Sequence, residues 1–193
     1  MSTTSEIIMS GDILTLADAQ RCGISKASFY QYIKRQGFVK IGHGIYAAPN
    51  AWIDELYILH KKCPKGVISH DEALYYHELI DREPLRHTLT VYSGYNTQRL
   101  LAAGYKAYMV KKELLELGKI SVVDNYGNTI PIYDLERTIC DLIRNRNAFE
   151  AQDFYTALKA YIARKDKDLN RLMRYAKLFR VDKVLRQYLG VLL

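Results

Sequence analysis

The sequence predicts an α+β protein, in which an N-terminal winged helix-turn-helix precedes a larger mixed domain. Residues 15–47 carry two helix caps, two glycine stops and a short hairpin pattern. Residues 87–133 contain short β-branched, alternating runs, which indicate a small β-sheet. Residues 134–192 repeat apolar side chains at helical spacing, which predicts a C-terminal helical bundle.

The first two helices are predicted from their capping residues. Thr15 is a favoured N-cap residue, and Asp18 at the third following position completes a weak capping box. This helix ends before Gly23, because glycine suits the left-handed conformation that follows many helices. Ser25 caps a second helix, which ends before Gly37. Two helices joined by a tight glycine turn are typical of the helix-turn-helix.

The second helix has an apolar face and a basic face. Phe29, Tyr30 and Ile33 fall on one side, which predicts the core. The opposite side carries cations, a glutamine and small residues without any acid. Arg and Lys can bond guanine, Gln can bond adenine, and the helix N-terminus favours a phosphate. The expected DNA contacts of this helix are Ser25, Lys26, Ala27, Ser28, Gln31, Lys34 and Arg35.

A hairpin is predicted directly after this helix. Residues 38–41 and 45–47 form its strands, and residues 42–44 (Gly-His-Gly) form the turn, because glycine reaches positive φ freely. A hairpin in this position is the wing of a winged helix-turn-helix, so Lys40 and His43 are expected to reach a backbone phosphate or the minor groove. A lone GxG is a weak dinucleotide signal, and no βαβ unit follows it.

The predicted domain boundary lies at residue 50. Residues 1–50 form the DNA-binding domain, and residues 51–193 form a second domain with an α/β core over about 66–141 and basic helices over about 142–193. A helix over 52–62, with Trp52 on its apolar side, is expected to link the two.

Two further helix starts are predicted inside the second domain. Ser69 is expected to cap a helix with Glu72 in a capping box. Asp134 is expected to cap another helix, whose core face includes Ile139 and whose Glu136 and Arg137 project outward or pair with neighbours.

The last quarter of the chain is strongly basic. Residues 142–193 carry 12 Lys or Arg against five Asp or Glu, and several of the cations recur at three-residue steps. Such rows indicate either a solvated face or a second nucleic-acid surface, and both interpretations remain open. The residues of this secondary basic surface are Arg164, Lys165, Arg171, Arg174, Lys177, Arg180, Lys183 and Arg186.

Composition favours a cytoplasmic protein with an anionic partner. The formal net charge is +7, and no apolar run approaches the roughly 20 residues that span a bilayer. The first residues, MSTTSEIIMSGD, lack the basic flank and apolar stretch of a secretory signal. Cys22, Cys63 and Cys140 form no CxxC pair, which predicts free, buried or half-buried thiols.

Enzymatic chemistry, a metal site and a cofactor are not expected. The contiguous Ser69, His70 and Asp71 cannot form a triad by themselves, and His60 with Cys63 lacks further ligands. A nuclease cluster is the one enzymatic alternative, but a lysine in the ExK position is missing. Its carboxylates would be Asp124, Asp134, Glu136 and Asp141.

Three segments, in this order, resemble the AbiEi family of antitoxins from type IV abortive-infection toxin–antitoxin systems, which serve in phage defence. They read GISKASFYQYIKRQGFVKIGHGIYA, SHDEALYYHEL and YDLERTICDLI. The resemblance implies that the N-terminal winged helix represses its own operon by binding inverted repeats in double-stranded DNA. It also implies that the C-terminal domain counteracts a nucleotidyltransferase-like toxin without a stable complex.

Two alternatives to this function remain open: a DNA-binding regulator unrelated to a toxin, and an antitoxin that binds its toxin directly. A monomer in solution is expected, with pairing on DNA left open.

Overall fold

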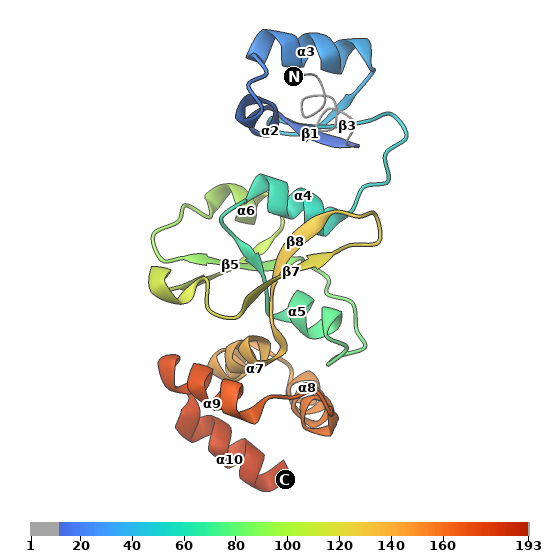
Figure 1. Ribbon diagram of the computed structural model, residues 1–193. Coiled ribbons are helices and arrows are strands. Elements are labelled where there is room, and N and C mark those ends of the chain that lie inside the picture. The colour runs from blue at the N-terminus through green and yellow to red at the C-terminus, as the bar shows by residue number, and fades with distance from the viewer. Residues whose placement is uncertain (1–11, 193) are drawn as a thin grey trace. The chain divides into compact units, whose positions relative to one another are not determined.

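The computed structural model describes residues 12–192 and divides into two compact units (Figure 1). The first unit extends to Pro64 and includes residues 123–128; the second holds residues 65–122 and the chain from Thr129 onward. The fold is mixed α+β, with small sheets and C-terminal helices, as the sequence predicts. The predicted lack of a secretory signal concerns the first residues, which up to Gly11 lie outside the described range.

The first unit contains a three-stranded antiparallel sheet in the order β1-β3-β2. Thr15 Oγ1 accepts a hydrogen bond from Asp18 N at 3.0 Å, which confirms the first cap, and Ser25 Oγ accepts one from Ser28 N at 3.1 Å, which confirms the second. The elements are β1 (Ile13–Thr15), α2 (Leu16–Arg21), α3 (Lys26–Arg35), β2 (Val39–Gly42), β3 (Ile45–Ala47) and α4 (Glu55–Lys62).

The hairpin turn is shorter than the sequence predicts. Gly42 belongs to β2, where the register shifts between Lys40 and Gly42 at a bulge. Of the two glycines of this turn, only Gly44 has a positive φ, of 69°. The two-residue turn of His43 and Gly44 therefore closes the hairpin, and Gly42 is not required there for its backbone freedom.

The first unit continues beyond residue 50, where the sequence predicts a boundary. Ile58 on α4 is buried in one cluster with Ile13, Ile45 and Ala47, so α4 completes the core of this unit. The helix predicted over 52–62 begins only at Glu55. Trp52 lies before it and is 75% exposed, so it is not part of an apolar helix face. Asp54 caps α4 instead, because its Oδ1 accepts a hydrogen bond from Tyr57 N at 2.9 Å.

The second unit is built on a five-stranded mixed sheet in the order β6-β5-β4-β8-β7. Strand β4 is antiparallel to β5 and parallel to β8, and β5 is parallel to β6. With two residues, β4 is too short to produce a strand pattern in the sequence. The strands are β4 (Val67–Ile68), β5 (Thr88–Tyr92), β6 (Lys106–Val110), β7 (Lys119–Val123) and β8 (Thr129–Tyr133).

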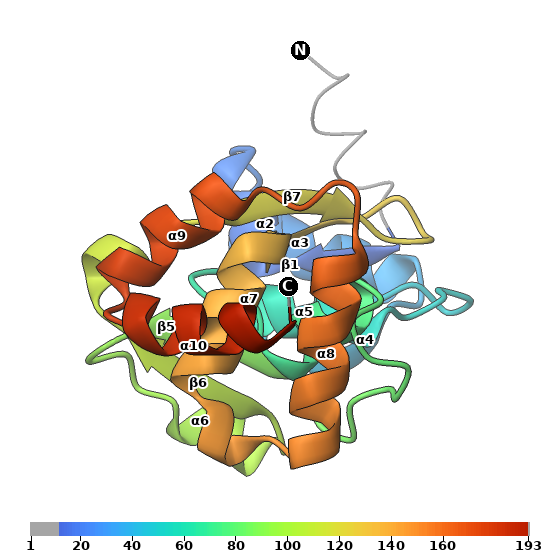
Figure 2. The ribbon, with the colours of Figure 1, turned by 90° about the horizontal axis from the view of Figure 1, so that it is seen from below.

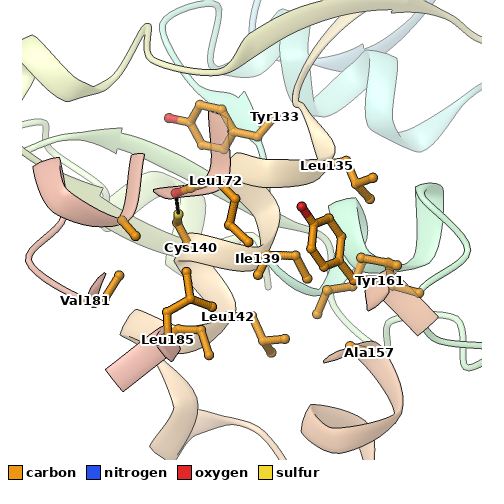
Figure 3. Packing of buried hydrophobic residues seen from close by; sticks show 14 of the residues in the cluster. Tyr133, Leu135, Ile139, Cys140, Leu142, Ala157, Tyr161, Leu172, Val181 and Leu185 are labelled. Carbon is orange, nitrogen blue, oxygen red and sulfur yellow. Dashed lines mark hydrogen bonds between the residues drawn. The ribbon is translucent and has the colours of Figure 1, made fainter. Parts of the chain in front are cut away.

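Helices α5 and α7 to α10 lie on one side of this sheet (Figure 1), and α7 runs between α8 and α9 with α10 across them (Figure 2). Ile139, Leu142 and Cys140 of α7 are fully buried in one cluster with Ala157, Leu172 and Leu185 of these three neighbours (Figure 3). The helices are α5 (Asp71–Tyr76), α6 (Gln98–Ala102), α7 (Leu135–Arg144), α8 (Ala151–Ala163), α9 (Leu169–Leu178) and α10 (Asp182–Leu192), with short 3-10 turns η1 (Lys112–Leu114) and η2 (Arg146–Ala148).

One expectation for the second unit is wrong, and another holds in one of its two alternatives. Ser69 does not cap α5: the N-cap residue is His70, which makes no side-chain capping bond, and Ser69 is buried beside β5, where its Oγ accepts a hydrogen bond from Thr90 Oγ1 at 2.8 Å. For Glu136 and Arg137 only the outward orientation is wrong: both are buried, and both pair with neighbours, which was the other expected alternative.

Candidate nucleic-acid interface

The candidate interface is the exposed face of helix α3, whose opposite face packs into an aromatic cluster. Phe29 and Ile33 are buried, as predicted. Tyr30 is 39% exposed instead of buried, because its ring lies at the edge of this cluster, with its centroid 5.5 Å from that of Phe29 and 6.1 Å from that of Tyr46. The hairpin ring of Tyr46 also lies 5.7 Å from Phe29, so helix and hairpin share one aromatic core.

All seven predicted contact residues around α3 are exposed: Ser25, Lys26, Ala27, Ser28, Gln31, Lys34 and Arg35. A shallow depression on this face is lined in part by Gln31 and Arg35. The hydroxyls of Ser25 and Ser28 lie 2.9 Å apart and share a hydrogen bond at the start of the helix. The N–H of Ser28 is bonded to Ser25 Oγ, and the N–H groups before it at the start of α3 are those that can donate to an anion.

The predicted wing residues are also exposed. Lys40 lies on β2 opposite Tyr46, and His43 lies in the turn between β2 and β3. The ring of Tyr46 packs the hairpin against Phe29 of α3. The backbone at Lys40 and His43 is therefore held in place relative to the helix.

An ion-pair network around Asp18 connects α2 to α4 in the first unit. Asp18 of α2 accepts hydrogen bonds from the Thr15 hydroxyl at 2.7 Å and from Lys61 Nζ at 2.9 Å, and it also pairs with Arg21. Burial opposes ionisation of Asp18, but the bonds from Lys61, Thr15 and Arg21 outweigh it and lower the pKa of this carboxyl. The Asp18 carboxylate is therefore compensated locally by Lys61 and Arg21.

The predicted secondary basic surface does not form one continuous row. Arg164 pairs with Asp166 at 2.8 Å, and Arg171 lies 3.6 Å from the buried Glu136 and 3.5 Å from Asp168. Arg180 lies between α9 and α10 instead of on the last helix, with a φ of 58°. The remaining members, Lys165, Arg174, Lys177, Lys183 and Arg186, are exposed.

The carboxylates of the alternative nuclease cluster have separate structural partners. Asp134 caps α7 and accepts from the Tyr175 hydroxyl at 3.1 Å, and Glu136 accepts from the backbone N–H of Asp168 at 2.9 Å. Asp141 accepts from Arg137 Nε at 3.0 Å, whereas Asp124 accepts within its own β7–β8 loop. Over residues 12–192, no group of three His, Cys, Asp or Glu side chains has a metal-binding arrangement.

A buried polar cluster surrounds His70 and was not anticipated from the sequence. The ring of His70 stacks on that of Tyr108 with centroids 3.4 Å apart, and its Nε2 lies 3.0 Å from Asn145 Nδ2. Because the Asn145 amide donates, Nε2 accepts, and Nδ1 carries the proton that it donates to Ser69 Oγ over 2.9 Å. Burial, together with Arg137, Lys106 and Arg144, lowers the pKa of His70 well below its usual value, so the ring is neutral.

The backbone of His70 adds strain to this cluster. Its φ of 54° and ψ of −121° lie in a region that is nearly restricted to glycine, at the turn from β4 into α5. The adjacent Ser-His pair in the sequence is the only local sign of the cluster, and it does not identify the ring partners.

Comparison with known proteins adds information on the fold alone. No protein-family model and no curated protein matches the chain. The structure is similar to the crystal structure of RV2827C protein from Mycobacterium tuberculosis, with a TM-score of 0.55 and 14% sequence identity over 91% of this chain and 70% of that one. A likeness at this identity supports a shared arrangement of elements and carries no statement about activity.

Proposed function

We propose that this protein is a DNA-binding transcriptional repressor whose first unit acts as a winged helix-turn-helix, with α3 as the recognition helix and the β2–β3 hairpin as the wing. The observation that carries this proposal is the α3 face itself: Gln31, Lys34 and Arg35 are exposed together on a helix that Phe29 and Ile33 fix to the core. A rigid helix with bidentate donors and small neighbours suits a major groove.

The wing supports the same function. Lys40 and His43 are exposed on a hairpin that shares its aromatic core with α3. A cation held at a fixed distance from a recognition helix can contact a backbone phosphate and set the register of the helix in the groove. Binding to inverted repeats in the promoter of its own operon is the form that the family resemblance favours.

The test is fluorescence anisotropy with labelled double-stranded DNA from the upstream promoter. We expect Gln31→Ala and Arg35→Ala each to weaken binding by about 1–3 kcal/mol and to relax the preference for promoter DNA over scrambled DNA. Gln152→Ala and Lys159→Ala on α8 are matched controls, because both residues are exposed and lie far along the chain from α3. Unchanged promoter affinity in the two α3 variants would show that α3 is not the recognition helix.

We further propose that the second unit counteracts a nucleotidyltransferase-like toxin without a stable complex. This part of the proposal rests on the AbiEi resemblance of the SHDEALYYHEL and YDLERTICDLI segments, which contribute the buried cluster of His70 and the buried network of Arg137.

Division of labour between the units is tested with the full chain. A triple substitution of Gln31, Lys34 and Arg35 to Ala is expected to abolish promoter repression and to leave rescue of cells from the co-expressed toxin intact. Loss of rescue by this folded variant would refute the division. Co-purification of the toxin at physiological salt would instead favour direct binding, and absence of any rescue would leave a regulator unrelated to a toxin.

A further inference from the structure

A cationic cleft lies in the second unit, on the part of the chain that the proposed DNA interface does not use. It has a volume of about 330 Å³ and opens where the end of β6, the turn η1, the end of α7 and the end of α9 come together. Three cations line it, Lys111, Arg144 and Arg180, against one acid, Glu113. None of the three cations forms a direct ion pair with a carboxylate among residues 12–192.

The cations come from three different elements that share no sequence repeat. Cations are favoured at helix C-termini, which accounts for Arg144 and Arg180 taken singly. It does not account for Lys111, which follows β6, nor for the convergence of all three on one cleft. The side chain of Arg144 is also held by β6, because its Nη2 donates a hydrogen bond to the carbonyl oxygen of Met109 at 3.2 Å.

Arg180 stands where glycine is the usual residue. The N–H of Val181 bonds to the carbonyl oxygen of Ala176 and the N–H of Arg180 to that of Lys177, which is the bonding of a glycine-type helix stop. The φ of 58° at Arg180 is unfavourable for a side chain of this size. Arg180 therefore lines the cleft from a position where the backbone conformation favours glycine, a conformation that Glu78 also adopts at the end of α5.

The floor of the cleft is rigid and apolar. Phe179 is 9% exposed, and Leu114 and Val110 lie beside it. Behind this floor the guanidinium of Arg137 lies 4.3 Å from the Phe179 ring centroid and donates to the carbonyl oxygen of Leu114 at 2.8 Å. Asp141 balances the charge of Arg137, so Arg137 fixes the lining without adding to the net charge.

We propose that this cleft binds the phosphate group of a small phosphorylated molecule. Three cations that line one cleft can supply charge-assisted hydrogen bonds to the terminal oxygens of a phosphate, and such bonds are strong. The volume exceeds that of a phosphate alone, and the exposed Leu178 beside Phe179 offers an apolar contact for the body of a phosphate monoester. The proposal is independent of the function assigned to α3.

The test is isothermal titration calorimetry of the full chain with inorganic phosphate, adenosine monophosphate and adenosine, at an ionic strength fixed with sodium chloride. We expect saturable binding of the two phosphates below about 10 mM and none of adenosine. Tighter binding of the monophosphate assigns a monoester, and equal binding assigns inorganic phosphate; either result supports the site.

The variants Arg180→Gly and Lys111→Gln are expected to weaken phosphate binding roughly five- to tenfold each. Arg180→Gly is suited to this test because glycine relieves the positive φ, so the variant folds while losing the cation. Arg186→Gln, an exposed cation of α10 outside the cleft, is the matched control and is expected to bind normally.

Three results would overturn the proposal: no saturable binding of either phosphate, an equal loss in Arg186→Gln, or variants that weaken DNA binding while phosphate stays unbound. The last result would assign the cleft to the DNA footprint. Failure of the α3 variants to alter promoter binding would leave this proposal unaffected, so the two can fail separately.

Discussion

The close approach of Gly118 to helix α7 gives the sharpest quantitative prediction. Gly118 has a φ of 75°, and a Cβ placed on it would lie 2.6 Å from Arg137 Cβ, 3.1 Å from Arg137 Cγ and 3.1 Å from Asp134 Oδ1. Arg137 cannot move away, because its Nη1 donates to the carbonyl oxygens of Leu114 and Leu117 at 2.8 and 2.7 Å and its Nε to Asp141 at 3.0 Å. Gly118→Ala must therefore displace the start of α7 or the turn before β7.

We expect Gly118→Ala to lower the free energy of unfolding by about 3–4 kcal/mol. Roughly 1 kcal/mol comes from the left-handed backbone, and about 2–3 kcal/mol from the overlap with a side chain that is fixed at both ends. Such a loss is a large fraction of the stability of a typical domain, which is about 5–15 kcal/mol.

Gly104→Ala is the matched control in the same unit. Its φ is 86°, and nothing lies within 4 Å of the position that a Cβ would take there, so it carries the backbone cost alone, about 1 kcal/mol. Urea titration followed by circular dichroism gives both free energies. Similar losses in the two variants would show that Arg137 yields, and the description of a rigid interior network would be wrong.

Three further predictions follow from capping, burial and charge. Ser25→Ala removes the cap of α3 and is expected to cost about 1 kcal/mol in urea unfolding, whereas Ser25→Asn restores most of it. The pKa of His70 is lowered by burial, so below the usual histidine value of 6.5 the unfolded chain binds a proton that the folded chain does not. The stability advantage of the wild type over His70→Gly is therefore expected to shrink as the pH falls from 7 to 5, and an advantage constant with pH would contradict the neutral buried ring. Lys40→Ala is expected to weaken binding to promoter and scrambled DNA alike. It is also expected to reduce the slope of the logarithm of the binding constant against the logarithm of salt concentration by about one. Loss of sequence preference would instead assign Lys40 to base contacts.

Features that depend on neighbouring residues were predictable from the sequence. Thr15, Ser25 and Asp134 each accept a capping hydrogen bond from the N–H three residues further on, as a cap requires. These bonds form within one turn of chain, so the sequence pattern contains both partners. The exposed face of α3 was predictable for the same reason, since helical periodicity alone separates Phe29 and Ile33 from their neighbours.

Features that depend on distant residues were not predictable. Ser69 has the sequence of a cap, but β5 brings Thr90 within 2.8 Å and the hydroxyl is used there. Arg137 reads as a surface residue, yet the carbonyl oxygens of Leu114 and Leu117 lie about 20 positions earlier in the chain and make its burial possible. The sequence predicts Arg180 in a regular basic row, because helical spacing does not reveal a helix end that lacks glycine.

The shortness of β4 has a consequence for how the second unit folds. The sheet is joined at its centre by Val67 and Ile68, which pair with Thr90 and Leu89 on one side, while Ile68 pairs with Ile132 on the other. These two residues, with the bond from the N–H of Ser69 to the carbonyl oxygen of Thr88 at 3.2 Å, supply few backbone hydrogen bonds between the pair β6–β5 and the pair β8–β7. We expect the side chains buried between the sheet and the helical layer to supply much of the cohesion, so sheet and helices are expected to unfold as one cooperative body.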